Sequence, residues 1–178
     1  ICCKSLNIPC VAFRYQNVYG PGQSLKNPYT GILSIFSTQI KNGNNINVFE
    51  DGLESRDFVF IDDVVAATIA GIEKEEANNH VFNVGSGVAT PVIKVAETLR
   101  SLYNSNVAIN VTGQYRIGDI RHNYADLSRS KSVLGFVPQT DFDTGIKKFA
   151  GWVNLQQTEA DTFEKSMAEL AAKGLLRK

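Results

Sequence analysis

The sequence has 178 residues, of which 43% are hydrophobic and 20% are charged. A chain of this length and composition can bury a core, which excludes disordered and fibrous proteins. Basic and acidic residues number 18 each, so no global field favours nucleic acid or an anionic membrane surface. Since no apolar run approaches the roughly 20 residues of a membrane helix, we expect neither nucleic acid nor a membrane as a partner.

The three cysteines, Cys2, Cys3 and Cys10, lie in the first ten residues and show neither disulfide nor metal-ligand spacing. This pattern favours reduced thiols, a cytoplasmic protein and no metal site. The opening ICCKSLNIPC has no initiator methionine and no signal-peptide pattern, and it is typical of the end of a helix. We therefore expect the chain to be a fragment of a longer protein.

The first third of the chain predicts a strand, a helix and a second strand. Residues 10–15, CVAFRY, are rich in β-formers and predict a buried strand before the Gly20-Pro21-Gly22 turn. Apolar residues three or four positions apart predict a helix over residues 31–41, which Asn42-Gly43 would end. Residues 46–52, INVFEDG, alternate as a short strand that enters a turn.

The middle of the chain repeats this alternation. Within residues 56–75 the apolar period changes from two to about 3.6, which predicts a strand followed by a helix with Asp62 and Asp63 at its N-terminus. Residues 80–87, HVFNVGSG, predict a strand with a glycine exit. Thr90 as N-cap and Pro91 as first helical residue then predict a helix to residue 105.

The last part of the chain is predicted to be mostly helical. Residues 107–112, VAINVT, are a further strand candidate, and a loop over residues 113–126 follows it. Beyond Phe142 the pattern is helical to the end of the chain, where one apolar stripe favours a surface helix over a partner-binding helix. The alternation of strands and helices predicts an α/β fold.

Asn17 stands directly after the first predicted strand, which raises the question of what it binds. Ligands of open α/β sheets bind beyond the carboxyl ends of strands, so Asn17 lies where a ligand would be recognised. The alternative is that its side chain satisfies the backbone of the turn, as asparagine often does.

Two arginines also lie close to strand ends or in loops. Arg56 and Arg116 could converge on a pyrophosphate, because guanidinium groups form charge-assisted, bidentate bonds to phosphate. Charge pattern alone favours ordinary ion pairs instead, with Arg56 bound to Asp57 or Glu54 and Arg116 bound to Asp119.

Other chemical signatures are weak. His80 and His122 have no neighbours at metal-ligand spacing, and NVGSGVATP lacks the third glycine of a dinucleotide-binding loop. No Ser-His-Asp arrangement or nucleophile elbow is visible. The residues alone thus indicate a ligand-binding α/β module without a catalytic base.

Four motifs follow one another over residues 10–138: RYQNVYGPGQ, VFEDGLESRDFVFIDDVVAA, VFNVGSG and YRIGDIRHNYADLSRSKSVLGF. Their order resembles the C-terminal half of the extended short-chain dehydrogenase/reductase family, specifically its nucleotide-sugar epimerases and dehydratases. The closest likeness is to the UDP-glucose 4-epimerase type. The segment SLKNPYTGILSIF is also similar to enzymes that epimerise dTDP-linked deoxysugars.

The resemblance implies the C-terminal substrate-binding part of an NAD(P)-binding Rossmann-fold enzyme. Residues 1–20 would end the dinucleotide-binding domain, and residues 21–178 would form the nucleotide-sugar-binding domain. Family members epimerise C4 through a 4-keto intermediate, with NAD as hydride carrier. NAD would be bound mainly by an N-terminal half that also supplies a Tyr-x-x-x-Lys motif upstream of Ile1. The parent would be a homodimeric enzyme, and this chain alone would be inactive.

The resemblance also implies site residues. Three positions match those beside the nicotinamide: Tyr15, Gln16 and Val18. Eight positions match those that bind the nucleotide sugar, with diphosphate contacts first, then the ribose hydroxyl, the base pocket and the sugar: Asn17, Arg56, Arg116, Asp119, Leu33, Asn47, Phe49 and Asn123.

Two departures from the family pattern leave the sugar open. Gln16 replaces an aromatic residue, and Gly22 stands in a turn that often carries arginine. Alternatives to an epimerase are a 4,6-dehydratase or decarboxylase on the same scaffold, whose additional acid and base residues would lie upstream. A non-catalytic nucleotide-sugar-binding module is the alternative from another class.

Overall fold

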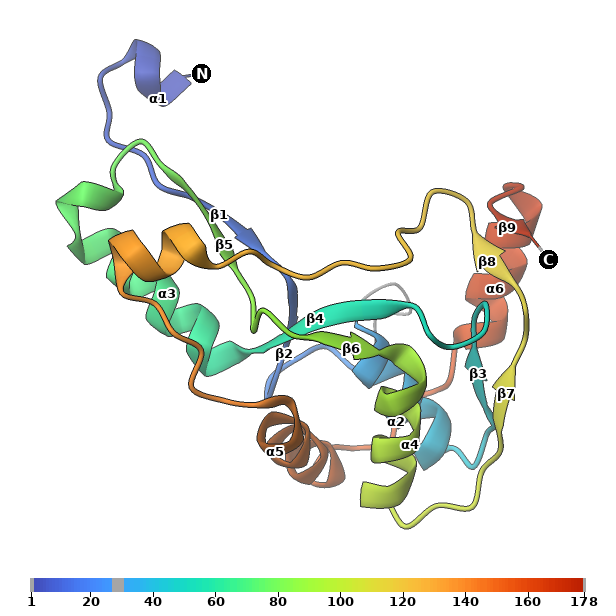
Figure 1. The fold of residues 1–178 in the computed structure, drawn as a ribbon. Coiled ribbons are helices and arrows are strands. Elements are labelled where there is room, and N and C mark those ends of the chain that lie inside the picture. Colours follow the sequence, from blue (N-terminus) through green and yellow to red (C-terminus); the bar gives the residue numbers. More distant parts are fainter. Residues whose placement is uncertain (1, 27–30, 178) are drawn as a thin grey trace.

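The computed structural model describes residues 2–26 and 31–177 (Figure 1). Short helical turns occur at Glu75–Ala77 and Ser130–Leu134. The other helices and strands are, in chain order, α1 Cys2–Ser5, β1 Ala12–Tyr15, β2 Asn17–Tyr19, α2 Ile32–Lys41, β3 Ile46–Val48, β4 Ser55–Phe60, α3 Ile61–Glu73, β5 Val81–Val84, β6 Ala89–Pro91, α4 Val92–Leu102, β7 Ile109–Val111, β8 Tyr115–Arg116, α5 Phe142–Asn154, α6 Phe163–Ala172 and β9 Leu176–Arg177.

The described strands form four small sheets. β1 pairs in parallel with β5, and β3 pairs in parallel with β7. Between these pairs, β4 lies parallel to β2 and antiparallel to β6, while β8 and β9 form an antiparallel pair. Figure 1 shows α2, α4 and α5 gathered below the central sheet, and β3, β7, β8 and α6 at the far end from β1. The predicted α/β class is confirmed.

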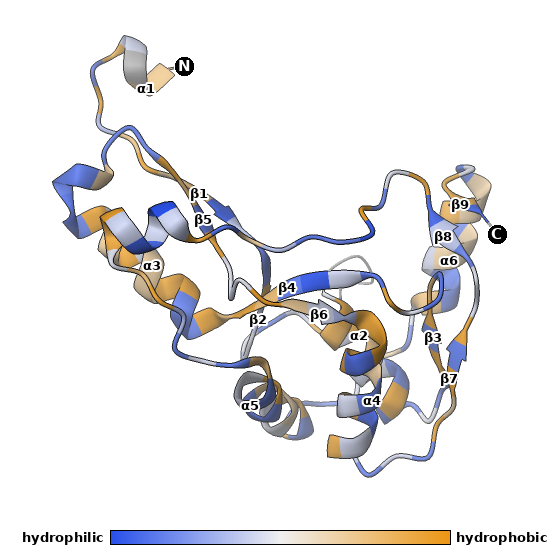
Figure 2. Ribbon diagram, in the orientation of Figure 1, coloured by the Kyte–Doolittle hydropathy of each residue, from blue (hydrophilic) through white to orange (hydrophobic). Residues whose placement is uncertain are grey.

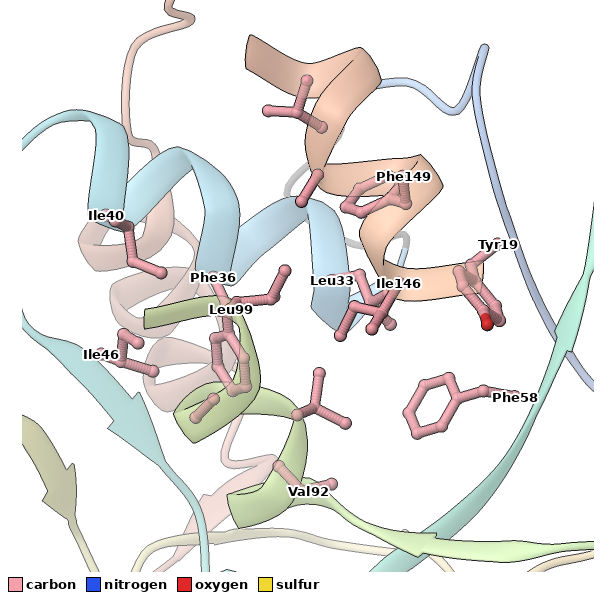
Figure 3. Close-up of a cluster of buried hydrophobic side chains, with 14 of the residues drawn as sticks. Tyr19, Leu33, Phe36, Ile40, Ile46, Phe58, Val92, Leu99, Ile146 and Phe149 are labelled. Carbon is pink, nitrogen blue, oxygen red and sulfur yellow. The ribbon is translucent and has the colours of Figure 1, made fainter. Parts of the chain in front are cut away.

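The larger hydrophobic core lies among α2, α4, α5 and the strands β3 and β4. Leu33, Phe36 and Ile40 occupy the inner face of α2, as the spacing of apolar residues predicted. Figure 3 shows them directed at Leu99 and Ile146 from the two neighbouring helices. This core fixes α2 beside β3 and β4, which carry the polar residues of the site.

A second core forms where α3 covers the β1–β5 pair. Phe82 and Val84 of β5 are fully buried there, and Phe13 of β1 packs beside them. Leu134 and Phe136 close the cluster from the C-terminal side. The predicted domain boundary after residue 20 stays a prediction, but this core shows that later segments pack with β1.

Three predicted elements differ from the structure. The first strand begins at Ala12 instead of residue 10, and the prediction that it is buried is wrong, because all of its residues except Phe13 are exposed. The predicted N-cap at Thr90 is wrong: Thr90 pairs with Arg56 in the β4–β6 ladder, and the helix starts at Val92. The prediction that the chain is helical from Phe142 to its end is also wrong, because the chain leaves α5 at Asn154 and starts a new helix at Phe163.

Figure 2 shows that the long connection from β8 back towards α3 is mostly hydrophilic. A buried carboxylate holds this connection in place. Asp57 of β4 is 0% exposed and accepts hydrogen bonds from the backbone N–H groups of Ser86 (2.6 Å), Gly87 (2.9 Å) and Ala125 (3.0 Å). A Cβ atom at Gly85 would overlap the Asp57 carboxylate, which explains the glycine exit of the motif VFNVGSG.

None of the helices in the described ranges has the length and apolar character that crossing a bilayer requires. The polar residues that bear on function lie along β2, β4 and β8.

Replacing Asp57 with alanine should lower the free energy of unfolding by about 3 to 5 kcal/mol, because several buried donors lose their acceptor at once. Chemical denaturation of the variant measures this loss. The matched control is Asp62→Ala at the exposed start of α3, which should cost about 1 kcal/mol or less. Equal losses in the two variants would show that the Asp57 contacts do not hold the loops.

Candidate functional site

A cavity of about 220 Å³ opens among α2, β2, β3, β4 and β8. Ile32, Ile35 and Phe36 of α2 form its apolar side. Six of the residues that the sequence predicts to bind a nucleotide sugar line the cavity: Asn17, Asn47, Phe49, Arg56, Arg116 and Asp119. Residues up to about 100 positions apart in the chain are thus gathered around one space of ligand size.

The sheet register explains how Asn17 and Arg56 come together. Asn17 is aligned with Phe58 in the parallel β2–β4 pair. Because side chains two positions apart on a strand share a face, Arg56 projects to the same side as Phe58 and Asn17. Both polar side chains therefore face the cavity, one from the start of each strand.

Arg56 is held firmly by neighbouring groups. Its Nη2 atom lies 2.9 Å from Oδ1 of Asp119, and only 16% of its side chain is exposed. Its Nη1 atom donates to the carbonyl oxygens of Ser55 (2.9 Å) and Arg121 (3.1 Å). The sequence alternative paired Arg56 with Asp57 or Glu54, and in the structure Asp119 takes that place.

Arg116 is less fully engaged than Arg56. Its Cζ atom lies 5.1 Å from the centre of the Phe49 ring, a cation–π distance. Its Nε atom is buried and has no hydrogen-bond partner within the described residues. The backbone N–H of Asp119 donates to the carbonyl oxygen of Arg116 (3.2 Å), which closes the turn between them. Arg116 thus lines the cavity with its guanidinium against the Phe49 ring and without an ion pair among the described residues.

Glu54 is an acid that sequence reasoning did not assign to the site. It lines the cavity with 7% of its surface exposed, and its Oε2 atom is buried without a partner among the described residues. Burial raises the pKa of its carboxyl, and the nearby charges of Glu50 and Asp51 act in the same direction, against Arg56. The carboxyl is thus biased towards its neutral form.

The three carboxylates of Glu50, Asp51 and Glu54 lie within 4.8 Å of one another, which is close enough for a metal ion. Arg121 binds this group from outside, with Nη2 2.6 Å from Oδ2 of Asp51 and Nη1 on Glu50. Hydrogen bonding to Arg121 lowers the pKa of Asp51. One guanidinium is therefore already paired with two of the three acids, and it balances one of their charges.

Leu33 and Asn123 lie away from the cavity wall. Leu33 is 1% exposed and faces the core beside Ile146 (Figure 3). Its neighbours Ile32 and Ile35 line the cavity instead. Asn123 is half-buried, and its backbone N–H donates to the carbonyl oxygen of Ser55 (3.1 Å). Asn123 is therefore beside β4, one residue from Arg56, but outside the described cavity.

The residues predicted to lie beside the nicotinamide sit on other surfaces. Tyr15 is exposed, with its hydroxyl 2.8 Å from Oγ1 of Thr68 on α3. Gln16 has a buried side-chain oxygen without a partner among the described residues, and Val18 lines a separate hollow with Gly20. Asn17 and Val18 thus serve two different spaces, as alternation along a strand requires.

Phe163 is a further lining residue that the sequence did not reveal. It is the first residue of α6, and its ring centre lies 6.5 Å from that of Phe49. The apolar stripe of residues 160–178 indicated a helix but carried no signal of where that helix would pack.

Residues 2–85 match the NAD dependent epimerase/dehydratase family. The chain is 41% identical over 145 residues to dTDP-L-rhamnose 4-epimerase of Burkholderia thailandensis. This alignment covers 82% of the chain and 40% of that relative. It is 27% identical over 150 residues to UDP-N-acetyl-alpha-D-glucosaminuronate decarboxylase of Bacillus cytotoxicus. That alignment covers 82% of the chain and 46% of the decarboxylase.

A solved structure, UDP-glucose 4-epimerase of Thermotoga maritima with UDP-glucose, is similar with a TM-score of 0.74 and 30% identity. The similar region covers 85% of this chain and 48% of the epimerase chain. The matched residues 2–85 belong to the NAD dependent epimerase/dehydratase family. The resemblance read from the four motifs is therefore confirmed. The chain spans about 40 to 48% of the lengths of these relatives.

The raised pKa of Glu54 predicts a pH-dependent gain in stability when this carboxyl is removed. The contribution of Glu54 to stability is full below its unfolded pKa and is lost as pH rises through its higher folded pKa. Glu54→Gln cannot ionise, so it should raise the Tm at pH 7 and leave it nearly unchanged at pH 4.

The control for this measurement is Glu97→Gln, an exposed acid on α4. Its Tm should differ little from the wild-type value at both pH values. A Glu54→Gln variant that shifts the Tm equally at pH 4 and pH 7 would show that ionisation of Glu54 plays no part.

Proposed function

We propose that this chain is the nucleotide-sugar-binding part of an NAD-dependent 4-epimerase that acts on a UDP- or dTDP-linked hexose. The observation that carries the proposal is the convergence of Arg56 and Arg116 on one cavity in a chain of zero net charge. Two guanidinium groups suit a diphosphate, and the Phe49 ring offers a surface for a base. The names of the relatives supply the reaction and both pyrimidine nucleotides.

The cavity would act by holding the constant part of the substrate. Diphosphate contacts remote from the reacting carbon supply binding energy, which is used to orient the sugar. Bound NAD supplies the hydride acceptor and donor for C4. Asn17 and the two arginines would hold the diphosphate while the 4-keto sugar presents its opposite face. Asp119 would accept a hydrogen bond from a ribose hydroxyl in addition to its ion pair with Arg56.

The β1–β5 pair supports an adjoining dinucleotide-binding part. Parallel sheets are normally buried on both faces, and an isolated pair of strands is marginally stable. Here Tyr15 and Val81 are exposed, and so are the apolar side chains of Ile69 and Ile72 on α3. We propose that residues 1–20 end the dinucleotide-binding part, that further strands of it cover these surfaces, and that the buried oxygen of Gln16 meets the cofactor side.

The parent would be cytoplasmic, because Cys2, Cys3 and Cys10 are free thiols. It would also be a homodimer, because the resembling enzymes dimerise through the dinucleotide-binding domain. The relative named as a decarboxylase favours a second candidate, decarboxylation or dehydration of a nucleotide sugar on the same scaffold. Product analysis of the complete enzyme with UDP-glucose, dTDP-hexose and UDP-glucuronate distinguishes the two reactions. A complete sequence without Tyr-x-x-x-Lys would favour a binding module.

Removing Arg116 should weaken nucleotide binding. In the complete enzyme, Arg116→Ala should reduce UDP or dTDP affinity by about 1.5 to 3 kcal/mol, the range for a hydrogen bond to a charged group. Calorimetric titration measures the affinity, and the Tm should change little because Arg116 forms no ion pair within the described residues.

The control is Arg129→Ala, an exposed arginine outside the cavity, which should bind nucleotide like the wild type. A lower Tm with unchanged nucleotide affinity in Arg116→Ala would contradict the diphosphate role and show that Arg116 is structural.

Asn123 is proposed to set the size of the sugar site. A small side chain there leaves room for a 2-acetamido group, and steric exclusion is worth about 1 to 3 kcal/mol per group. Asn123→Tyr should therefore shift the ratio of kcat/KM for UDP-glucose over UDP-N-acetylglucosamine by about 5- to 150-fold towards UDP-glucose. If the ratio stays constant, Asn123 serves only the turn beside Ser55.

A further inference from the structure

The C-terminal segment of residues 159–177 returns to the cavity instead of lying free on the surface. Figure 1 shows α6 and β9 beside β8, β3 and β7, at the end of the molecule where the cavity opens. Phe163 lines this cavity together with Phe49, and the two ring centres are 6.5 Å apart with the ring planes inclined by 38°. The ring of Phe163 is half-buried, so part of it stays open to the cavity.

Side chains from the end of α2 fix the entry to α6. The Nδ2 atom of Asn42 donates to the carbonyl oxygen of Glu159 (2.8 Å), and the Nδ2 atom of Asn44 donates to Oδ2 of Asp161 (2.8 Å). The other carboxylate oxygen of Asp161 accepts the backbone N–H of Phe163 (2.9 Å). Asp161 therefore connects the wall helix α2 directly to the backbone of Phe163.

The other end of the segment is attached to the strand that carries Arg116. β9 pairs with β8, with Arg116 opposite Leu176. The N–H of Ile117 donates to the carbonyl oxygen of Leu175 (2.9 Å), which extends this pairing. The segment is thus held at both ends, and its first helical residue lies at the aromatic end of the cavity.

We infer that Phe163 is a base-contacting residue, whose ring packs against the pyrimidine of the nucleotide sugar beside the adjoining Phe49 ring. The inference rests on the proposed function and names a specificity-determining residue for it. The geometry favours this role because a flat heterocycle that enters beside Phe49 also meets Phe163, while Arg116 reaches the phosphates. Aromatic rings bind bases through stacking, which does not need a hydrogen-bond partner.

The test is nucleotide binding by the complete enzyme, with UDP and inorganic pyrophosphate as probes. Phe163→Ala should weaken UDP binding about 5- to 30-fold, the lower part of the range for loss of one base-stacking ring. Pyrophosphate has no base, so its inhibition constant should change less than twofold. Phe163→Tyr keeps the ring and should bind UDP within about threefold of the wild type. Lys165→Ala, an exposed neighbour on α6, is the matched control.

The inference would be overturned by either of two conclusions. Unchanged UDP affinity in Phe163→Ala would show that the ring does not touch the base. Equal weakening of UDP and pyrophosphate, or a loss of UDP affinity that Phe163→Tyr does not restore, would show that Phe163 only supports the wall of the cavity. If the wild type and Arg129→Ala bind neither UDP nor dTDP, the proposed function itself fails, and this outcome is distinct from the other two.

Discussion

The buried carboxylate of Asp57 is the contact on which the rest of the site depends. It binds backbone N–H groups from the turn after β5 and from the connection that returns from β8. Arg56 is its neighbour on β4 and projects to the opposite face, into the cavity. On β4, the Asp57 side chain therefore holds two loops, and the neighbouring Arg56 side chain carries a positive charge to the cavity. The ion pair from Arg56 to Asp119 then places the β8 turn over the cavity.

Although the chain has zero net charge, local placement of charge brings two arginines with different partners to one cavity. Arg56 is largely satisfied by Asp119 and two carbonyl oxygens, whereas Arg116 keeps a buried donor without a partner among the described residues. Buried donors of this kind cost free energy unless a ligand meets them. Burial raises the pKa of the Glu54 carboxyl beside these arginines.

The sequence predicted the parts of the fold that have strong periodicity. The inner face of α2, the change from strand to helix after β4 and the strand β5 all follow from apolar spacing, and the structure confirms them. Thr90 was assigned to a helix cap because local rules cannot register its pairing with Arg56 on a distant strand. The break between α5 and α6 was missed for a similar reason, since it depends on the tertiary contact from Asn44 to Asp161.

The site residues that lie inside a family motif were easier to predict from the sequence than those outside the motifs. Asn17, Arg56 and Arg116 stand in recognisable motifs and do meet at one cavity. Leu33 was assigned to the wall, but helix phase places its neighbours Ile32 and Ile35 there instead. Phe163 had no motif, because its place depends on how the last segment folds back onto β8.

The most direct test of the central claim is a crystal structure of the complete enzyme with NAD and UDP or dTDP. The account predicts that the diphosphate lies between the guanidinium groups of Arg56 and Arg116, with the base beside Phe49. A nucleotide bound elsewhere, or a diphosphate that contacts neither arginine while Arg116 keeps its free donor, would contradict it.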